Sequence, residues 1–127
     1  MRTTLTEKEQ RDYLLGKIKK PVHFTYPEPP RHRKGTLADR FLLKDGEHGS
    51  VIYWHMIDLI EFEDKYWLRI TYYRYKKKEK KWNFSGQTSF STSISRFEEL
   101  FVKAIKEKQW MKTLFKDVFK KSTGELR

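Results

Sequence analysis

Residues 65–90 carry aromatic rings and positive charges in an alternating order. The first part of this segment predicts a β-strand, in which successive side chains point to opposite faces. One face would carry rings and guanidinium groups, with Trp67, Arg69, Thr71, Tyr73 and Tyr75. The other face is expected to be core, with Tyr66, Leu68, Ile70, Tyr72 and Arg74. Because exposed rings stack on unpaired bases and cations neutralise phosphates, the first face predicts a surface that binds single-stranded nucleic acid.

A lysine-rich turn follows this strand and would add phosphate contacts, through Lys76, Lys77, Lys78, Lys80 and Lys81. The returning strand, residues 82–90, would add polar side chains to the same face in a plain hairpin, through Asn83, Ser85 and Gln87. A second basic cluster precedes the sheet and contains Arg31, Arg33 and Lys34. A simpler interpretation also stands, in which the strand is half-exposed and the lysines form a solvated turn.

The composition narrows the class of protein. The chain has 127 residues, which suits one domain with a modest core. It has 28 Lys and Arg against 17 Asp and Glu, and a net charge of +11 raises the affinity for nucleic acids. The absence of cysteine excludes disulfides and thiolate sites. No apolar run approaches the roughly 18 residues that span a bilayer. We therefore expect a cytoplasmic protein with no membrane partner and no cofactor.

Two segments precede the predicted sheet. A capping box of Thr6 and Glu9 predicts a short helix within residues 1–20, and Pro21 would end it. Residues 21–36 are rich first in proline and then in basic side chains. They are expected to form an extended connector rather than a regular element.

The order of the predicted helices and strands indicates an α+β fold in one domain, residues 1–127. Residues 37–90 would form four antiparallel strands in a meander, at 37–44, 51–62, 65–75 and 82–90, with Asp45 and Gly46 in a loop. A capping box of Ser95 and Glu98 predicts an amphipathic helix over 95–120, followed by a tail, 121–127. A single helix of this length would be longer than a typical strand of the sheet on which it packs. It therefore either breaks near Lys108 and Gln109 or packs its second half on something else.

Asp58 lies in the most hydrophobic segment, residues 51–62. A buried carboxylate needs a partner. Arg40, Arg69 or Arg74 could supply it, which predicts a structural ion pair.

The order of these elements resembles the single-stranded nucleic-acid-binding group that includes the Whirly proteins and the transcription positive cofactor fold. The resemblance covers residues 37–107 and matches no diagnostic motif. It rests on the basic aromatic hairpin and on residues 86–100, Gly-Gln-Thr-Ser-Phe-Ser-Thr-Ser-Ile-Ser-Arg-Phe-Glu-Glu-Leu. It implies a four-stranded meander followed by a helix that dimerises. The N-terminal helix and the extended apolar stripe of the C-terminal helix depart from that pattern, so the resemblance does not define the geometry of the dimer.

Two other functions are compatible with the sequence. Glu63, Asp64 and Lys65 have the E-x-K form of metal-dependent nucleases, with Asp45 or Asp58 as the further acid. This triplet falls at a predicted turn, and such short patterns are common in charged chains. The four histidines show no close metal-ligand spacing.

The main alternative is a protein-interaction or assembly module that uses the apolar stripe of the C-terminal helix, with Trp110, Leu114, Phe115 and Phe119. Helices of this kind more often complete their own core or a homodimer than bind a foreign partner. We therefore expect a homodimer.

Overall fold

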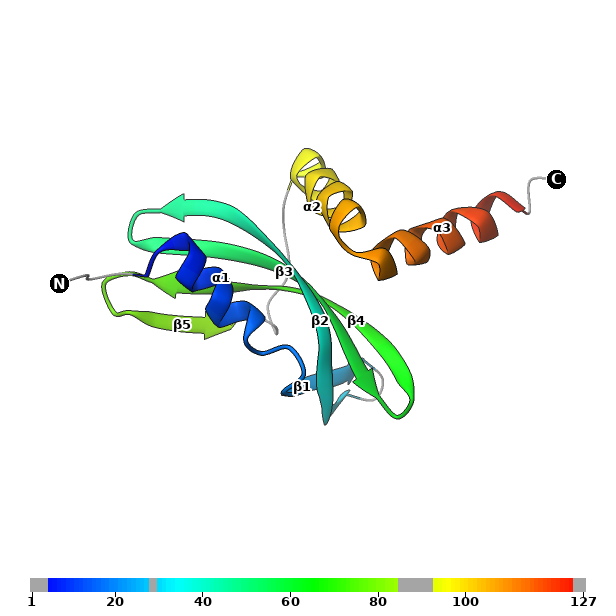
Figure 1. Cartoon of the computed structure of the whole chain (residues 1–127), viewed down its shortest axis with the longest axis horizontal. Helices are drawn as coiled ribbons and strands as arrows, with labels where there is room; N and C mark the ends of the chain where they lie inside the picture. The colour runs from blue at the N-terminus through cyan, green and yellow to red at the C-terminus, as the bar shows by residue number, and fades with distance from the viewer. Residues whose placement is uncertain (1–4, 28–29, 85–92, 125–127) are drawn as a thin grey trace. The chain divides into compact units, whose positions relative to one another are not determined.

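The structure of the chain is a computed structural model that describes residues 5–27, 30–84 and 93–124 (Figure 1). The chain forms two compact units, Met1–Phe90 and Ser91–Arg127. The first unit contains one helix and a curled antiparallel sheet, and the second contains two helices. The predicted α+β class and antiparallel sheet are confirmed.

The sheet has five strands rather than the predicted four, and each strand pairs with its neighbour in sequence. The strands are β1 (Pro21–Pro27), β2 (Pro30–His48), β3 (Val51–Phe62), β4 (Lys65–Lys76) and β5 (Lys81–Phe84). The additional strand, β1, occupies the segment predicted to be a connector. Its prolines stand at the two ends of an edge strand, where no interior ladder hydrogen bond is lost.

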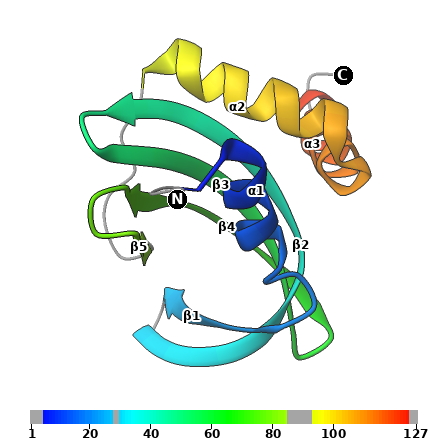
Figure 2. The same ribbon diagram turned by 60° about the vertical axis from the view of Figure 1, so that its left-hand side comes forward.

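β2 is much longer than the predicted 37–44 because two irregularities let it continue. The register with β3 shifts between Leu37 and Asp39 and again between Lys44 and Gly46. Gly46 has a φ of 139°, so the Asp45-Gly46 pair forms a bulge within the strand instead of the predicted loop. Bulges increase the local twist of a strand. The sheet accordingly curls strongly, as Figure 2 shows.

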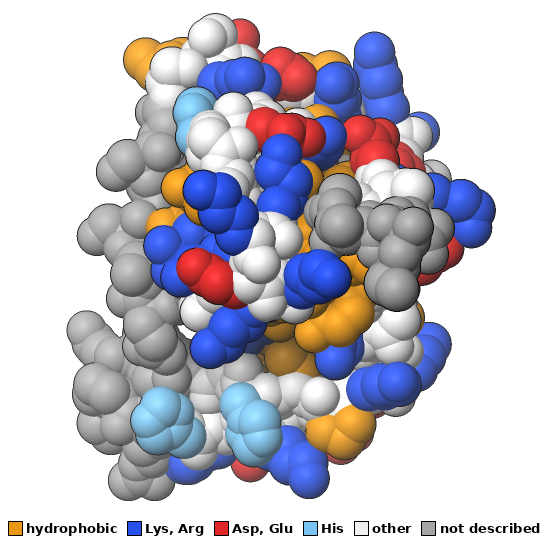
Figure 3. Space-filling view, turned by 90° about the vertical axis from the view of Figure 1, so that its left-hand side faces the viewer, with side chains coloured by type: hydrophobic (Ala, Val, Ile, Leu, Met, Phe, Trp, Pro, Cys, Tyr) orange, Lys and Arg blue, Asp and Glu red, His pale blue; other side chains and the backbone are white. Residues whose placement is uncertain are grey.

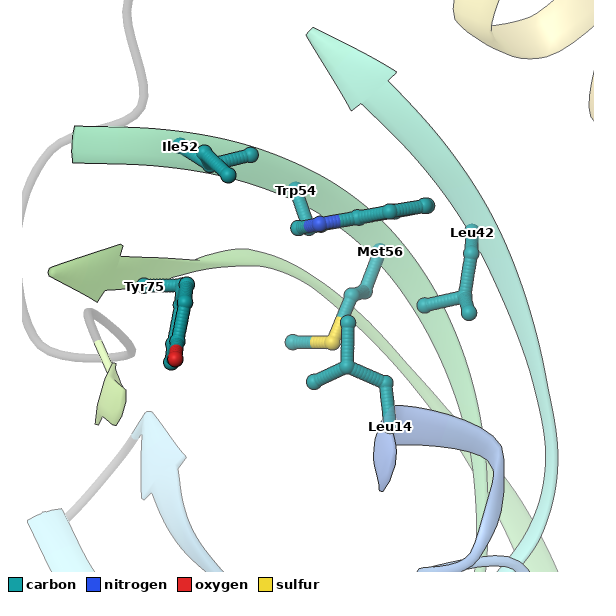
Figure 4. Close-up of a cluster of buried hydrophobic side chains, with 6 residues drawn as sticks. All are labelled: Leu14, Leu42, Ile52, Trp54, Met56 and Tyr75. Carbon is teal, nitrogen blue, oxygen red and sulfur yellow. The ribbon is translucent and has the colours of Figure 1, made fainter. Parts of the chain in front are cut away.

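Helix α1 (Glu7–Leu15) packs on one face of this curled sheet. We call this the inner face and its opposite the outer face. Leu14 of α1 packs there among Leu42, Trp54, Met56 and Tyr75 (Figure 4). The indole Nε1 of Trp54 also donates a hydrogen bond to Oε1 of Gln10, at 2.8 Å.

The predicted start of α1 is confirmed and its predicted extent is too long. Thr6 and Glu9 form the expected capping box. The helix ends at Gly16, whose N–H donates to the carbonyl of Asp12, rather than near Pro21. Lys19 then has a φ of 72°, so the chain turns before it enters β1.

The core packs on part of the β4 face that was predicted to bind, and the face that was expected to be core is the more exposed one. Tyr75 is 2% exposed and lies on the inner face, whereas Tyr66 and Leu68, which were expected to be core, are 63% and 44% exposed. The period of two is correct, but both faces of β4 carry aromatic residues. The sequence pattern therefore could not show which face α1 covers.

The second unit contains α2 (Ile94–Glu107) and α3 (Gln109–Gly124). Lys108, with φ −112° and ψ 121°, separates them, which confirms the predicted break at this point. The rings of Phe101 and Phe115 join the two helices at 5.1 Å between centroids. α2 begins two residues earlier than the predicted capping box places it, because the capping side chain is Ser93 and not Ser95. Within the described residues, no helix is long and apolar enough to cross a membrane.

Candidate nucleic-acid interface

A cleft of about 740 Å³ opens on the inner face of the first unit. Its lining is mainly aromatic, aliphatic and basic, and comes from the turn that follows α1 and from the strands of the sheet, β1 included. The residues are Lys17, Pro21, Val22, His23, Phe24, His32, Leu37, Arg40, Ile60, Trp67, Leu68, Arg69, Tyr73 and Phe84. None of these described residues is acidic. On the side viewed in Figure 3, hydrophobic surface is visible between Lys and Arg side chains.

The curl of the sheet shapes this cleft, and Gly35 allows the curl. A Cβ atom at Gly35 would lie 2.7 Å from the backbone oxygen of Glu61 and 3.3 Å from the ring of Phe24. Only glycine lets β2 approach β3 this closely and bring β1 over the inner face. Phe24 then packs against Trp67, with 5.9 Å between the ring centroids.

Two arginines of the cleft share one buried carboxylate. Arg40 binds Asp58 through Nε to Oδ1 at 2.7 Å and through Nη2 to Oδ2 at 3.1 Å. Arg69 reaches the same Oδ2 through Nη2 at 2.9 Å and Nε at 3.3 Å. We call Arg40, Asp58 and Arg69 the charged triad. The predicted pairing of Asp58 with Arg40 or Arg69 is confirmed, and the carboxylate binds both.

The charged triad has a net charge of one positive, because two arginines share one carboxylate. Arg40 and Asp58 are fully buried, and the Arg69 side chain is 16% exposed. Each guanidinium has five N–H groups. Each uses a third group on a carbonyl: Arg40 donates to Leu14 at 2.9 Å and Arg69 to His23 at 2.8 Å. Two N–H groups on each arginine therefore have no hydrogen-bond acceptor among the described residues. A buried excess charge is costly unless an anion balances it.

A chain of ring contacts leads along the inner face to the triad. Tyr13 of α1 stacks on Trp82 of β5, with centroids 4.8 Å apart and planes 6° apart. Trp82 contacts Tyr73 edge-on at 6.0 Å, and Tyr73 contacts Phe84 at 5.0 Å. The guanidinium carbon of Arg69 lies 4.8 Å from the centroid of the Phe84 ring. We call Tyr13, Trp82, Tyr73 and Phe84 the aromatic row.

Three of the aromatic and basic residues predicted on β4 line the cleft, and the fourth does not. Trp67, Arg69 and Tyr73 are in the lining, whereas Tyr75 is buried among core residues below α1 and has no surface for stacking. Burial raises the pKa of the Tyr73 phenol, and the nearby charge of Arg40 opposes that rise. Tyr73 is therefore a neutral ring at physiological pH.

β5 presents the opposite residues from those expected. Asn83 pairs with Arg74, and Phe84 pairs with Tyr73, so Asn83 lies on the outer face and Trp82 and Phe84 lie on the inner face. The turn between β4 and β5 aligns Lys76 with Lys81, and this register decides the faces. Ser85 and Gln87 lie outside the described residues.

The lysines of the β4–β5 turn are partly engaged by carboxylates. Lys77 contacts Glu47 at 2.9 Å, and its hydrogen bond lowers the pKa of Glu47. Lys76 lies 3.8 Å from Glu79. The remaining three, Lys78, Lys80 and Lys81, are exposed. Arg33 and Lys34 lie on β2 opposite Phe24 and His23, and the side chain of Arg31 is outside the described residues.

The residues of the nuclease alternative are not assembled into a metal site in the described parts of the chain. Glu63 and Asp64 have φ values of 52° and 60° and form the exposed turn between β3 and β4. Both oxygens of Asp58 accept hydrogen bonds from arginines. No group of three His, Asp or Glu side chains that could hold a metal occurs among the described residues.

Arg40, Tyr13, Trp82 and Phe84 belong to this candidate interface and were not predicted to from the sequence. Arg40 was expected only as a structural partner of Asp58, and Trp82 and Phe84 were placed away from the binding face. Comparison with protein-family models, with curated proteins and with solved structures gave no match.

Proposed function

We propose that the protein binds single-stranded nucleic acid on the inner face of the first unit, along the aromatic row and into the cleft. The observation that carries this proposal is the contact between the ring of Phe84 and Arg69 of the excess-positive charged triad, at the wall of the cleft. Base stacking and phosphate neutralisation are the two interactions that single strands require, and both groups occur together here.

The ends of the aromatic row are accessible to bases. Tyr13 is 40% exposed and Phe84 is 41% exposed, and both rings already contact a second planar group on one side. Lys17 adds a cation 4.9 Å from the centroid of Tyr13. Bases stacked on these two rings would leave the phosphates near Lys17 and Arg69.

The exposed lysines of the β4–β5 turn extend this surface. Lys81 begins β5, the strand that carries Trp82 and Phe84. Together with Lys78 and Lys80 it would attract the phosphates of a nucleic acid, whatever the base sequence. We therefore expect weak sequence preference and strong salt dependence.

The test is a titration of the full chain with fluorescent single-stranded DNA and RNA oligonucleotides. Phe84→Ala and Tyr13→Ala should each weaken binding about tenfold, since stacking contributes roughly 1 to 3 kcal/mol per base. Tyr66→Ala is the matched control, because Tyr66 is an exposed ring on the outer face. Equal losses for all three variants, or no binding by the wild type, would contradict the proposal.

Salt separates the phosphate contacts from stacking. Raising the salt concentration from about 50 to 200 mM should lower the affinity by orders of magnitude if several phosphates are neutralised. An affinity that is constant over this range would exclude the lysines of the turn and the charged triad from binding.

A further inference from the structure

We propose that the cleft binds one nucleotide through a terminal phosphate, a monoester, which the charged triad and Lys17 recognise. This inference rests on the proposed function and makes the cleft the place where the end of a strand is held. It identifies the ligand class of the cleft as a phosphomonoester joined to a flat ring.

The charge of the cleft fits a monoester better than an internal phosphate. The triad carries one excess positive charge, and Lys17 in the same lining adds a second. A phosphate inside a strand carries one negative charge, whereas a terminal phosphate carries about 1.5 to 2 at neutral pH. Among the described lining residues no carboxylate opposes it.

The donors are also fixed in place before any ligand arrives. Both guanidinium groups are held by Asp58 and by a backbone carbonyl, at Leu14 for Arg40 and at His23 for Arg69. Each keeps two further N–H groups on its terminal nitrogens, but only those of Arg69, whose side chain is 16% exposed, are accessible to a ligand, and the buried Arg40 contributes its charge. Planar donors of this kind bind phosphate oxygens in pairs, and holding them rigidly lowers the entropy cost of binding.

The size and lining of the cleft suit a ligand that contains a flat ring. Its volume of about 740 Å³ lies within the usual range of small-ligand sites. Trp67, Tyr73 and Phe84 provide ring surfaces around the triad. A base could therefore stack on one of these rings while its phosphate binds Arg69.

The experiment compares oligonucleotides of one sequence that carry a hydroxyl or a phosphate at the 5′ or the 3′ end, and compares adenosine, AMP and inorganic phosphate. The terminal phosphate should strengthen oligonucleotide binding at least about tenfold at one end, and AMP should bind at least about tenfold more tightly than adenosine or inorganic phosphate. Equal affinity of phosphorylated and unphosphorylated strands would overturn the inference while leaving the proposed function standing.

The variant that tests the triad is Arg69→Gln. It removes the excess charge but leaves Asp58 paired with Arg40, so the fold should be retained. We expect it to abolish the preference for the terminal phosphate. The control Lys112→Gln removes the same charge from an exposed position on α3 and should keep the preference. Loss of the preference in both variants, or in neither, would overturn the inference.

The two proposals can fail separately. If no oligonucleotide binds the wild type, the proposed function is wrong. AMP binding that is lost in Arg69→Gln would still support a monoester site in the cleft. Inorganic phosphate that binds as tightly as AMP would show a simple anion site and overturn the nucleotide inference.

Discussion

Asp58 on β3 links β2 and β4 directly, and α1 and β1 through two arginines. Its two oxygens accept hydrogen bonds from Arg40 on β2 and Arg69 on β4, and these arginines in turn donate to carbonyls of α1 and β1. The carboxylate therefore neutralises half of the buried positive charge and fixes the geometry of the cleft. Its removal should affect stability more than the removal of either arginine.

We predict that Asp58→Asn destabilises the protein by about 3 to 5 kcal/mol, because it leaves two guanidinium groups together without a counter-charge. The free energy of unfolding from urea titration measures this. Arg69→Gln is the comparison. It leaves Arg40 paired with Asp58, so it should lower the free energy of unfolding by less. An equal or smaller loss for Asp58→Asn would contradict this view of the triad.

The raised pKa of Tyr73 predicts how stability responds to alkali. In the unfolded chain the Tyr73 phenol ionises near its ordinary pKa, whereas burial keeps it protonated to higher pH in the folded state. The unfolded state then binds fewer protons, so stability should fall as the pH rises through about 10 and above.

Tyr73→Phe tests this prediction because it removes the titrating group and keeps the ring. Urea midpoints measured between about pH 9 and 11 should fall less steeply for this variant than for the wild type. Tyr66→Phe, at an exposed ring, is the control and should follow the wild type. If stability falls equally steeply with pH in all three proteins, the pKa of Tyr73 is not raised in the folded state.

At the residue scale, the sequence indicated the chemistry better than its placement. Asp58 was recognisable because a carboxylate in an apolar strand needs a cation, and the partners Arg40 and Arg69 followed from that need. The accessible rings were misassigned: Tyr75 and Phe84 both lie on the inner face, but Tyr75 is buried in the core beside α1 and Phe84 is exposed. Burial by α1 and the register of the β4–β5 turn decide this, and neither can be read from the alternation itself.

At the element scale, a strand was most predictable where its own pattern defines it. β3 has both predicted ends because an apolar run is bounded by polar turns. β1 was missed because prolines usually exclude a strand, and only the fold shows that they stand at its ends. β2 was cut short at Asp45-Gly46, where a bulge and a turn have the same sequence signature.

We predict that Gly35→Ala destabilises the first unit by about 1 to 3 kcal/mol, because the added methyl group meets the backbone of β3. Thermal or urea unfolding measures this. Lys34→Ala, at the exposed neighbouring position, should change the stability by no more than about 0.5 kcal/mol. If the two variants change the stability by the same amount, this close approach does not hold β1 against the inner face.

At the scale of the whole molecule, the second unit leaves apolar side chains in solvent. Val118 and Phe119 of α3 are 53% and 70% exposed, and Leu114 lies one turn earlier on the same helix. Monomeric proteins rarely expose a large contiguous apolar patch. The predicted homodimer would bury this surface, and it remains a prediction.

Sedimentation velocity at micromolar concentration should show a dimer for the wild type and a monomer for Phe119→Glu. Lys116→Glu is the control, because it introduces the same charged group on α3 at a position that is already polar. A wild-type monomer at these concentrations would refute the prediction. Oligonucleotide binding by the Phe119→Glu variant would show that the first unit acts without dimerisation.

The order of the strands has a consequence for the time course of folding. Each strand pairs with its neighbour in sequence, so the ladders from β2 to β5 close through short turns, which favours rapid folding. The contacts of α1 span much longer stretches of chain, with a sequence separation of 26 from Leu14 to Arg40 and of 44 from Gln10 to Trp54. We therefore expect α1 to dock after the sheet has formed. The burial of Trp54 should then appear in stopped-flow fluorescence as a phase slower than the gain of sheet signal in circular dichroism.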